Sequence, residues 1–296
     1  MTFKKASKWM SAASLALLLA GCGNKESSDA GSDSGSDFDN SQDIHVISRE
    51  DGSGTRDAFV EIVEITDADG EDATVSSATI QQGTSDVVST VSGDEYSIGY
   101  ISVGSLDESV KALKVDGVEP TEENIASGDY VVQRNLNIIQ GDKLSDVAQD
   151  FWDFIFSAEG QKIVSEKGAV PVDSAAPEYT GSGMKGQIAI AGSTSVEPFI
   201  TAISEAYAKH NPDVVFEISA TGSSAGVTAA IDGTADIGMA SRELDDDESS
   251  KVKEVKPLGI DGIAVIVNPN TPIDSISLDT IRGIFLGDIT SWADVK

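Results

Sequence analysis

Three short turns of the sequence combine glycine with serine or threonine, a composition that suits the binding of an oxyanion. They are Gly192-Ser193-Thr194-Ser195, Gly222-Ser223-Ser224-Ala225-Gly226 and Asp51-Gly52-Ser53-Gly54-Thr55. Each turn follows a predicted strand and precedes a predicted helix, whose first N–H groups are unpaired and lie at the positive end of the helix dipole. Hydroxyl groups add donors, and glycine lets a ligand approach the backbone closely.

A single turn of this kind is weak evidence, because serine and threonine are also common helix N-caps. Arg49 lies just before the third turn, and a guanidinium can donate two parallel hydrogen bonds to an oxyanion. We therefore expect the three turns and Arg49 to converge on one buried anion.

The second turn also matches G-x-S-x-G, the nucleophile elbow of hydrolases. That chemistry needs a histidine later in the chain, whereas His45 and His210, the two histidines, both precede the turn. The acidic run 67–72 faintly resembles a calcium loop but lacks the full ligand spacing. We expect neither an enzyme nor a metal or cofactor site.

The chain of 296 residues has a formal charge of −30, from 50 acidic and 20 basic residues. This charge argues against nucleic-acid binding, which needs basic surfaces. It does not exclude a small anion, because local N–H groups and one arginine can bind an anion despite a repulsive distant field.

The N-terminus has the pattern of a secretory signal. Basic residues precede an apolar run at 12–20, which ends in Leu19-Ala20-Gly21-Cys22, and this run is too short to span a membrane. A cysteine after Leu-Ala-Gly resembles a bacterial lipobox, so residues 1–22 are expected to be a lipoprotein signal peptide and Cys22 to carry the lipid, palmitate included. A plain signal-peptide junction is the alternative. Residues 23–42 predict a flexible tether.

The rest of the chain alternates predicted strands and helices, which indicates an α/β protein with a largely parallel sheet. Strands are predicted at 44–48, 97–101, 130–138, 187–191, 214–218, 236–239 and 260–267. Helices are predicted at 53–65, 85–91, 144–167, 195–210, 224–231 and 277–285. Serine, alanine, proline and glycine at 173–186 predict a linker.

Together these segments resemble the phosphate-binding (PstS-like) lipoproteins of bacterial phosphate ABC transporters. The resemblance rests on Ala191-Gly192-Ser193-Thr194-Ser195-Val196-Glu197-Pro198, Gly233 to Glu243, Asp261 to Asn268, Ile47 to Arg56, Ser97 to Ser102 and Ser157 to Lys162. In the family, however, the block at 187–296 comes first and the block at 43–172 follows it. We interpret the chain as a circular permutant in which 173–186 joins the old termini; a truncated tandem gene is the rival explanation.

The resemblance implies a type II periplasmic-binding-protein-like α/β fold, with two lobes and a ligand cleft at the hinge. One lobe would be split into 43–131 plus 267–296, and the other would be continuous over 132–266. The implied function is the capture of inorganic phosphate, as an expected monomer, for the permease subunits of an ABC importer. The protein would lie on the outer face of the bacterial cell membrane, anchored only by its lipid.

Carried over position by position, the family's ligand site falls on Thr194, Ser195, Ser223, Ser241, Arg49, Ser53, Gly54 and Thr55. Some members have aspartate where this chain has Ser241, and a carboxylate that accepts the phosphate proton is what rejects fully ionised sulfate. Asp261 is the candidate for that acceptor here, with Asp236, Asp57 and Glu243 as further candidates. Sulfate or molybdate binding, and a surface signalling or adhesion role on the same scaffold, remain open.

Overall fold

A computed structural model describes residues 38–173, 175–181 and 183–295, so the predicted signal peptide, Cys22 and most of the tether lie outside the described residues. The strands are β1 (His45–Arg49), β2 (Thr79–Gln81), β3 (Ser97–Ser102), β4 (Lys111–Ala112), β5 (Lys114–Val115), β6 (Gln133–Gln140), β7 (Val170–Pro171), β8 (Lys185–Gly192), β9 (Asp213–Ala220), β10 (Ile237–Ala240), β11 (Glu254–Val267) and β12 (Ser275–Ile276). The helices are α1 (Gly54–Val63), α2 (Thr84–Gly93), α3 (Glu122–Ser127), α4 (Asp146–Ile155), α5 (Ala158–Glu166), α6 (Glu197–His210), α7 (Ser223–Asp232), α8 (Asp246–Ser249) and α9 (Leu278–Leu286), with 3₁₀ turns η1 (Val103–Ser105) and η2 (Trp292–Asp294).

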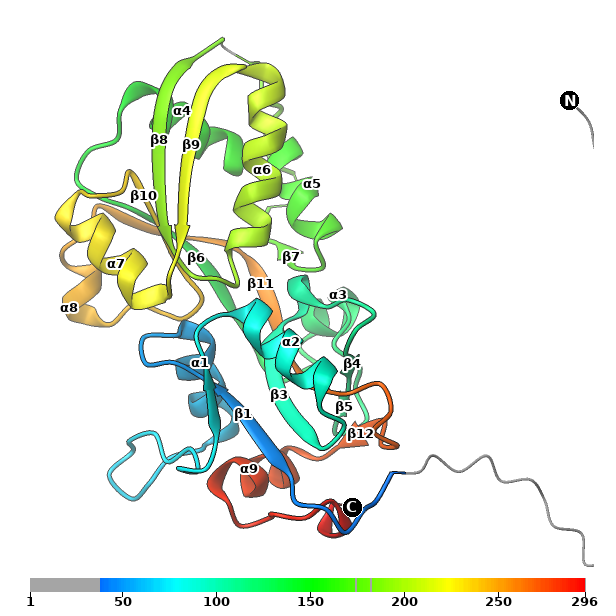
Figure 1. The fold of residues 1–296 in the computed structure, drawn as a ribbon. Coiled ribbons are helices and arrows are strands. Elements are labelled where there is room, and N and C mark those ends of the chain that lie inside the picture. The colour runs from blue at the N-terminus through cyan, green and yellow to red at the C-terminus, as the bar shows by residue number, and fades with distance from the viewer. Residues whose placement is uncertain (1–37, 174, 182, 296) are drawn as a thin grey trace, which may run out of the picture. The chain divides into compact units, whose positions relative to one another are not determined.

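Ten of these strands form one sheet, whose main path runs β2-β1-β3-β11-β6-β10-β8-β9 (Figure 1). The pairs at its two ends, among β2, β1 and β3 and among β10, β8 and β9, are parallel. The middle pairs, β3–β11, β11–β6 and β6–β10, are antiparallel. The prediction of a largely parallel sheet is therefore correct only at the ends, because β6 and β11 run in opposite directions through the centre.

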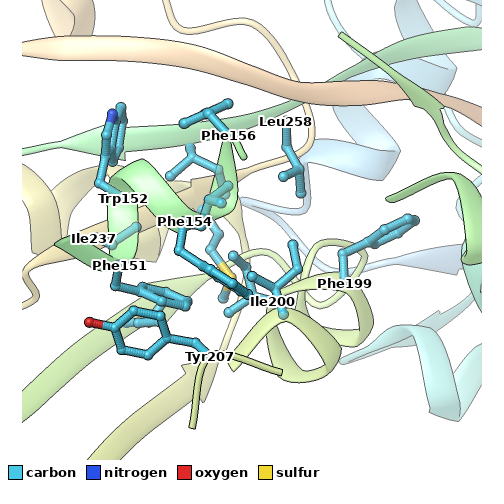
Figure 2. Packing of buried hydrophobic residues seen from close by; sticks show 14 of the residues in the cluster. Phe151, Trp152, Phe154, Phe156, Phe199, Ile200, Tyr207, Ile237 and Leu258 are labelled. Carbon is cyan, nitrogen blue, oxygen red and sulfur yellow. The ribbon is translucent and has the colours of Figure 1, made fainter. Parts of the chain in front are cut away.

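The strands β6 and β11 connect two separate hydrophobic cores. One core gathers residues between Leu136 and Leu258 around α4, α5, α6 and β8, and Figure 2 shows its aromatic centre, where Phe151 and Phe154 pack near Tyr207. The other core combines residues from the two ends of the chain, around α1, β3, the end of β11 and α9. Residues of β6 and β11 contribute to both cores or lie between them, so these two strands join the two halves. The predicted lobe boundaries, 43–131 plus 267–296 and 132–266, stay a prediction.

Two helix predictions need correction. The predicted helix at 144–167 is two helices, because Ser157 donates to Phe154 O at 2.7 Å and caps α5 by accepting from Gly160 N. The helix expected to be capped by Ser195 begins at Glu197, and its N-cap, Val196, has no side-chain cap. The Ser195 hydroxyl is therefore free for another contact, described below.

Two connecting segments are more firmly attached than their composition suggests. Phe38, in the predicted tether, packs on Tyr96 at a ring-centroid distance of 5.0 Å and on Trp292 at 5.8 Å. The prediction that the flexible tether extends to residue 42 is therefore wrong for its last residues, from Phe38 onward. In the linker, the Tyr179 hydroxyl donates to Asp150 at 2.7 Å and accepts from Asn211 at 2.9 Å.

The close approach of two glycines sets α7 against β8. A Cβ on Gly226 would lie 2.5 Å from Met239 O and 2.6 Å from the Cα of Gly192, and real Cβ atoms do not come so close. The first turn of α7, which carries Ser223, therefore depends on glycine three residues later.

We expect Gly226→Ala to destabilise the protein by about 1–3 kcal/mol, because a methyl group here overpacks two backbone segments. Chemical denaturation would measure this loss. Gly93→Ala is the matched control, since no atom lies within 4 Å of a Cβ at that position. Equal stability of the two variants would show that α7 can move away without cost.

Candidate functional site

The three glycine-rich turns meet at the N-termini of α1, α6 and α7. The Thr55 and Ser195 hydroxyls lie 2.8 Å apart, although they are 140 residues apart in the chain. Thr194 Oγ1 accepts from Arg49 Nη2 at 3.1 Å and lies 3.1 Å from Thr84 Oγ1. The turns that the sequence predicted to converge are thus in direct contact.

The turn at residues 222–226 completes this cluster of hydroxyl groups. Ser223 Oγ accepts from the backbone N–H of Ser241 at 3.0 Å and lies 3.3 Å from Ser241 Oγ. A Cβ on Gly54 would collide with Ser223 Oγ, so only glycine allows this approach. We call Thr55, Thr194, Ser195, Ser223 and Ser241 the hydroxyl cluster; four of these residues are buried and Thr194 is partly buried.

Arg49 provides the positive charge beside the hydroxyl cluster. Its side chain is only 2% exposed, and its Nε and Nη2 each donate to Glu50 at 2.8 Å. Tyr100 OH accepts from the Arg49 backbone N–H, and burial raises the pKa of Tyr100 to about 12, so this hydroxyl stays neutral. A charged guanidinium with a carboxylate partner leaves the local charge balanced before any ligand binds.

The remaining predicted residues have other partners. Ser53 Oγ caps α1 by accepting from Arg56 N. Asp261, fully buried in β11, accepts from Ser102 Oγ at 2.9 Å and from Arg134 Nη2 at 3.2 Å. No hydrogen bond joins Asp261 to the hydroxyl cluster among the described residues. Burial raises the pKa of Asp261, while Arg134 opposes that shift.

The further candidate carboxylates also have structural partners. Asp236 accepts from the backbone N–H of Ala189, and Glu243 accepts from the side chain of Asn135. Asp57 pairs with Arg242 at 3.2 Å. These contacts orient the backbone and hold α1 near the loop after β10.

Three charged residues that pair with candidate site residues were missed from the sequence. Glu50 follows Arg49 directly, and this adjacency was a usable signal. Arg134 is the one charged residue in the predicted strand 130–138, which is an unusual place for a cation. Arg242 pairs with Asp57 and with Glu248, but nothing in the local sequence indicated that α1 would lie beside it.

Arg242 links two parts of the chain that are distant in sequence. Its Nη1 and Nη2 donate to Glu248 at 2.7 and 2.8 Å, and its Nε pairs with Asp57 of α1. Near it, Ser224 N donates to Gly52 O at 3.2 Å. These contacts hold the turn before α1 against the start of α7.

The geometry offers no support for hydrolase chemistry at the G-x-S-x-G turn. His45 pairs with Asp94 and His210 with Glu159, and neither histidine contacts the turn in the part of the chain that the structure describes. Within the same residues no group of three or more His, Cys, Asp or Glu side chains could hold a metal ion. No helix there is both long and apolar enough to cross a membrane.

The chain matches one family model and several phosphate-binding proteins over most of its length. Residues 4–159 and 177–296 match the model of a PBP superfamily domain. Phosphate-binding protein PstS 2 of Streptococcus pneumoniae is 41% identical over 281 residues, which cover 94% of both proteins. Phosphate-binding protein PstS 2 of Streptococcus agalactiae is 44% identical over 284 residues, covering 94% of this chain and 93% of that protein.

A crystal structure supports the same likeness. The phosphate-binding protein of a phosphate ABC transporter from Streptococcus pneumoniae superimposes with a TM-score of 0.69 at 42% identity. The match covers 86% of this chain and all of that chain. Because the alignments with the PstS 2 proteins run nearly end to end, those relatives share the segment order of this chain.

Glu248 provides a test of the Arg242 link through its pH dependence. The hydrogen bond from Arg242 lowers the pKa of Glu248 from an ordinary value of 4.5, so the ionised form stabilises the fold. This stabilisation is present above pH 4.5 and is lost as the pH falls through the lowered pKa. We expect Glu248→Gln to cost about 1–3 kcal/mol at pH 7 and progressively less below pH 4.5.

Denaturation at several pH values measures this difference, with Glu205→Gln, at an exposed position of α6, as the control. A pH-independent cost would mean that Glu248 contributes by packing rather than by charge.

Proposed function

The chain belongs to the PBP superfamily and, within it, to the family of the PstS 2 phosphate-binding proteins, and from this premise we propose that it captures inorganic phosphate for an ABC importer. The fold is the mixed α/β, periplasmic-binding-protein-like fold that the sequence predicted. The observation that carries the proposal is the convergence of three helix N-termini with Arg49 and five hydroxyl groups. Such a cluster suits a tetrahedral oxyanion, which needs many donors in a small volume.

The proposed ligand contacts divide by chemistry. The residues of the hydroxyl cluster donate hydrogen bonds from their hydroxyl groups to the ligand. These bonds replace the hydrogen bonds that the hydroxyl groups make with one another when no ligand is bound. Gly54 and Ser53 lie at the start of α1, where helix N–H groups are unpaired. Arg49 supplies the charged donors. Because the donors come from both cores, a bound anion would hold the two halves closed.

Selectivity for phosphate requires a carboxylate that accepts its proton. Asp261 stays the predicted acceptor, with its carboxylate engaged by Ser102 and Arg134. Glu50 is a rival that the structure reveals, since its side chain is 12% exposed and pairs with Arg49 at the hydroxyl cluster. Without such an acceptor, sulfate or molybdate would bind equally well.

The remaining proposals concern the place of the protein in the cell. Lipidation of Cys22 would anchor it to the outer face of the membrane, where it would deliver phosphate to the permease subunits as a monomer. No covalent chemistry and no cofactor are needed for this role.

We also propose that the segment order is a circular permutation of the wider family's order. The two ends of the described chain support this, because Ile44 N donates to Thr290 O at 2.7 Å and Trp292 N donates to Gln42 O at 3.2 Å. A chain that ran directly from residue 295 into residue 43 would need little rearrangement.

Calorimetric titration of the protein from residue 23 onward tests phosphate capture, with sulfate and molybdate as competing ligands. We expect phosphate to bind and sulfate to be rejected. Arg49→Gln should weaken binding at least about 30-fold, because it removes a buried charged donor and leaves Glu50 unpaired. Arg282→Gln, which changes an arginine of α9 that pairs with Asp279 and Glu64, should bind like the unchanged protein.

The same titration separates the two carboxylates. The variant that loses its preference for phosphate over sulfate, Asp261→Asn or Glu50→Gln, identifies the proton acceptor. Absence of binding to every oxyanion would reject phosphate capture and favour a surface signalling or adhesion role.

A rearranged gene tests the permutation. A variant that continues from Val295 into Asp43 and opens new ends between Asp173 and Met184 should fold and bind phosphate with an affinity close to that of the natural order. Failure to fold, judged by circular dichroism, would contradict the proposed equivalence of the two orders.

A further inference from the structure

Arg134 occupies the hinge region with part of its hydrogen-bonding capacity unused. It lies in β6 directly opposite Asp261 of β11 in the antiparallel ladder. Its side chain is 4% exposed and that of Asp261 is 0% exposed. One nitrogen, Nη2, donates to Asp261 at 3.2 Å, whereas Nε and Nη1 are buried and have no hydrogen-bond partner.

The ion pair with Asp261 does not explain why Nε and Nη1 of Arg134 have no hydrogen-bond partner. Asp261 also accepts from Ser102 Oγ and from the backbone N–H of Gly104, so its own acceptor capacity is well used. Buried polar groups in native proteins nearly always have partners, and a buried cation needs them most. The two free donors of Arg134 therefore indicate an acceptor that arrives from outside the chain.

Arg134 shares a pocket with residues that adjoin members of the hydroxyl cluster in the sequence, among them Arg242, which follows Ser241. Together with Ala58 and Ile62 of α1 and with Arg242 it lines a pocket beside β6, and Ala58 lies one turn after Gly54. Burial lowers the pKa of Arg134, and the charge of Arg49 acts in the same direction, so the two guanidinium groups are within electrostatic reach. An anion bound within reach of both guanidinium groups would offset this repulsion.

We propose that Arg134 is a second guanidinium of the anion site, which donates Nε–H and Nη1–H to the bound oxyanion while Asp261 holds it in position. This inference rests on the proposed function and adds a residue to it. The ligand would then contact β6 itself, and binding would be coupled directly to the strand on which the two cores turn. Asp261 would be a positioning residue, whatever its part in accepting a proton.

Titration of the unchanged protein and of three variants tests the role of Arg134. The variants are Asp261→Asn, the double variant Arg134→Gln/Asp261→Asn, and Arg282→Gln as the control that removes an arginine away from the hydroxyl cluster. The double variant contains no unpaired buried carboxylate, so it should stay folded, as circular dichroism and thermal unfolding would show. We expect it to bind phosphate at least about 30-fold more weakly than Asp261→Asn, and Arg282→Gln to bind normally.

A spectroscopic measurement distinguishes direct contact between Arg134 and the phosphate from a purely structural role of Arg134. The Nε–H resonance that disappears in Arg134→Lys should shift when phosphate is added to the unchanged protein. If the unchanged protein binds phosphate but this resonance stays in place, or if the double variant binds as tightly as Asp261→Asn, Arg134 is only a structural partner and the inference is wrong. If the unchanged protein binds no phosphate, the proposed function fails first, and this inference fails with it.

Discussion

The contact between the turn before α1 and the start of α7 is the constraint on which the rest of the site depends. Gly54 approaches Ser223 and Ser241 so closely that no side chain fits between them, and Ser224 N donates to Gly52 O across the same contact. This approach brings residues that are distant in the sequence within reach of one small ligand. The hydroxyl cluster forms because the backbones can touch there, and this is possible only with glycine.

Charge at the site is arranged in pairs, which explains how a protein with a formal charge of −30 can offer a site to an anion. Arg49 pairs with Glu50, Arg134 with Asp261, and Arg242 with Glu248 and Asp57. Burying an ion costs free energy, and pairing each arginine with a carboxylate offsets part of that cost. An anion would then be held mainly by hydroxyl groups and helix N-termini, whose partial charges do not depend on a net positive field.

The strands β6 and β11 have two tasks in this fold. They carry the central antiparallel part of the sheet, and they hold the buried Arg134–Asp261 pair between the two cores. The antiparallel hydrogen bonds of the two strands fix the register in which Arg134 faces Asp261.

Local patterns in the sequence were sufficient to predict most helices and strands, and also the convergence of the three turns with Arg49. These predictions needed only short segments of sequence. A glycine-rich turn between a strand and a helix fixes where the strand ends and where the helix begins, and so places the turn at the helix N-terminus. The packing of Phe38 was not predictable in this way, since it depends on Tyr96 and Trp292, which are distant in the sequence. The break at Ser157 rests on a local capping signal, which the helical pattern of apolar residues obscured. The partners of Asp261, Glu50 and Arg134 depended on tertiary structure as well. Electrostatic pairing joins residues such as Arg134 and Asp261 that are 127 positions apart, and only the folded chain decides which buried charges meet.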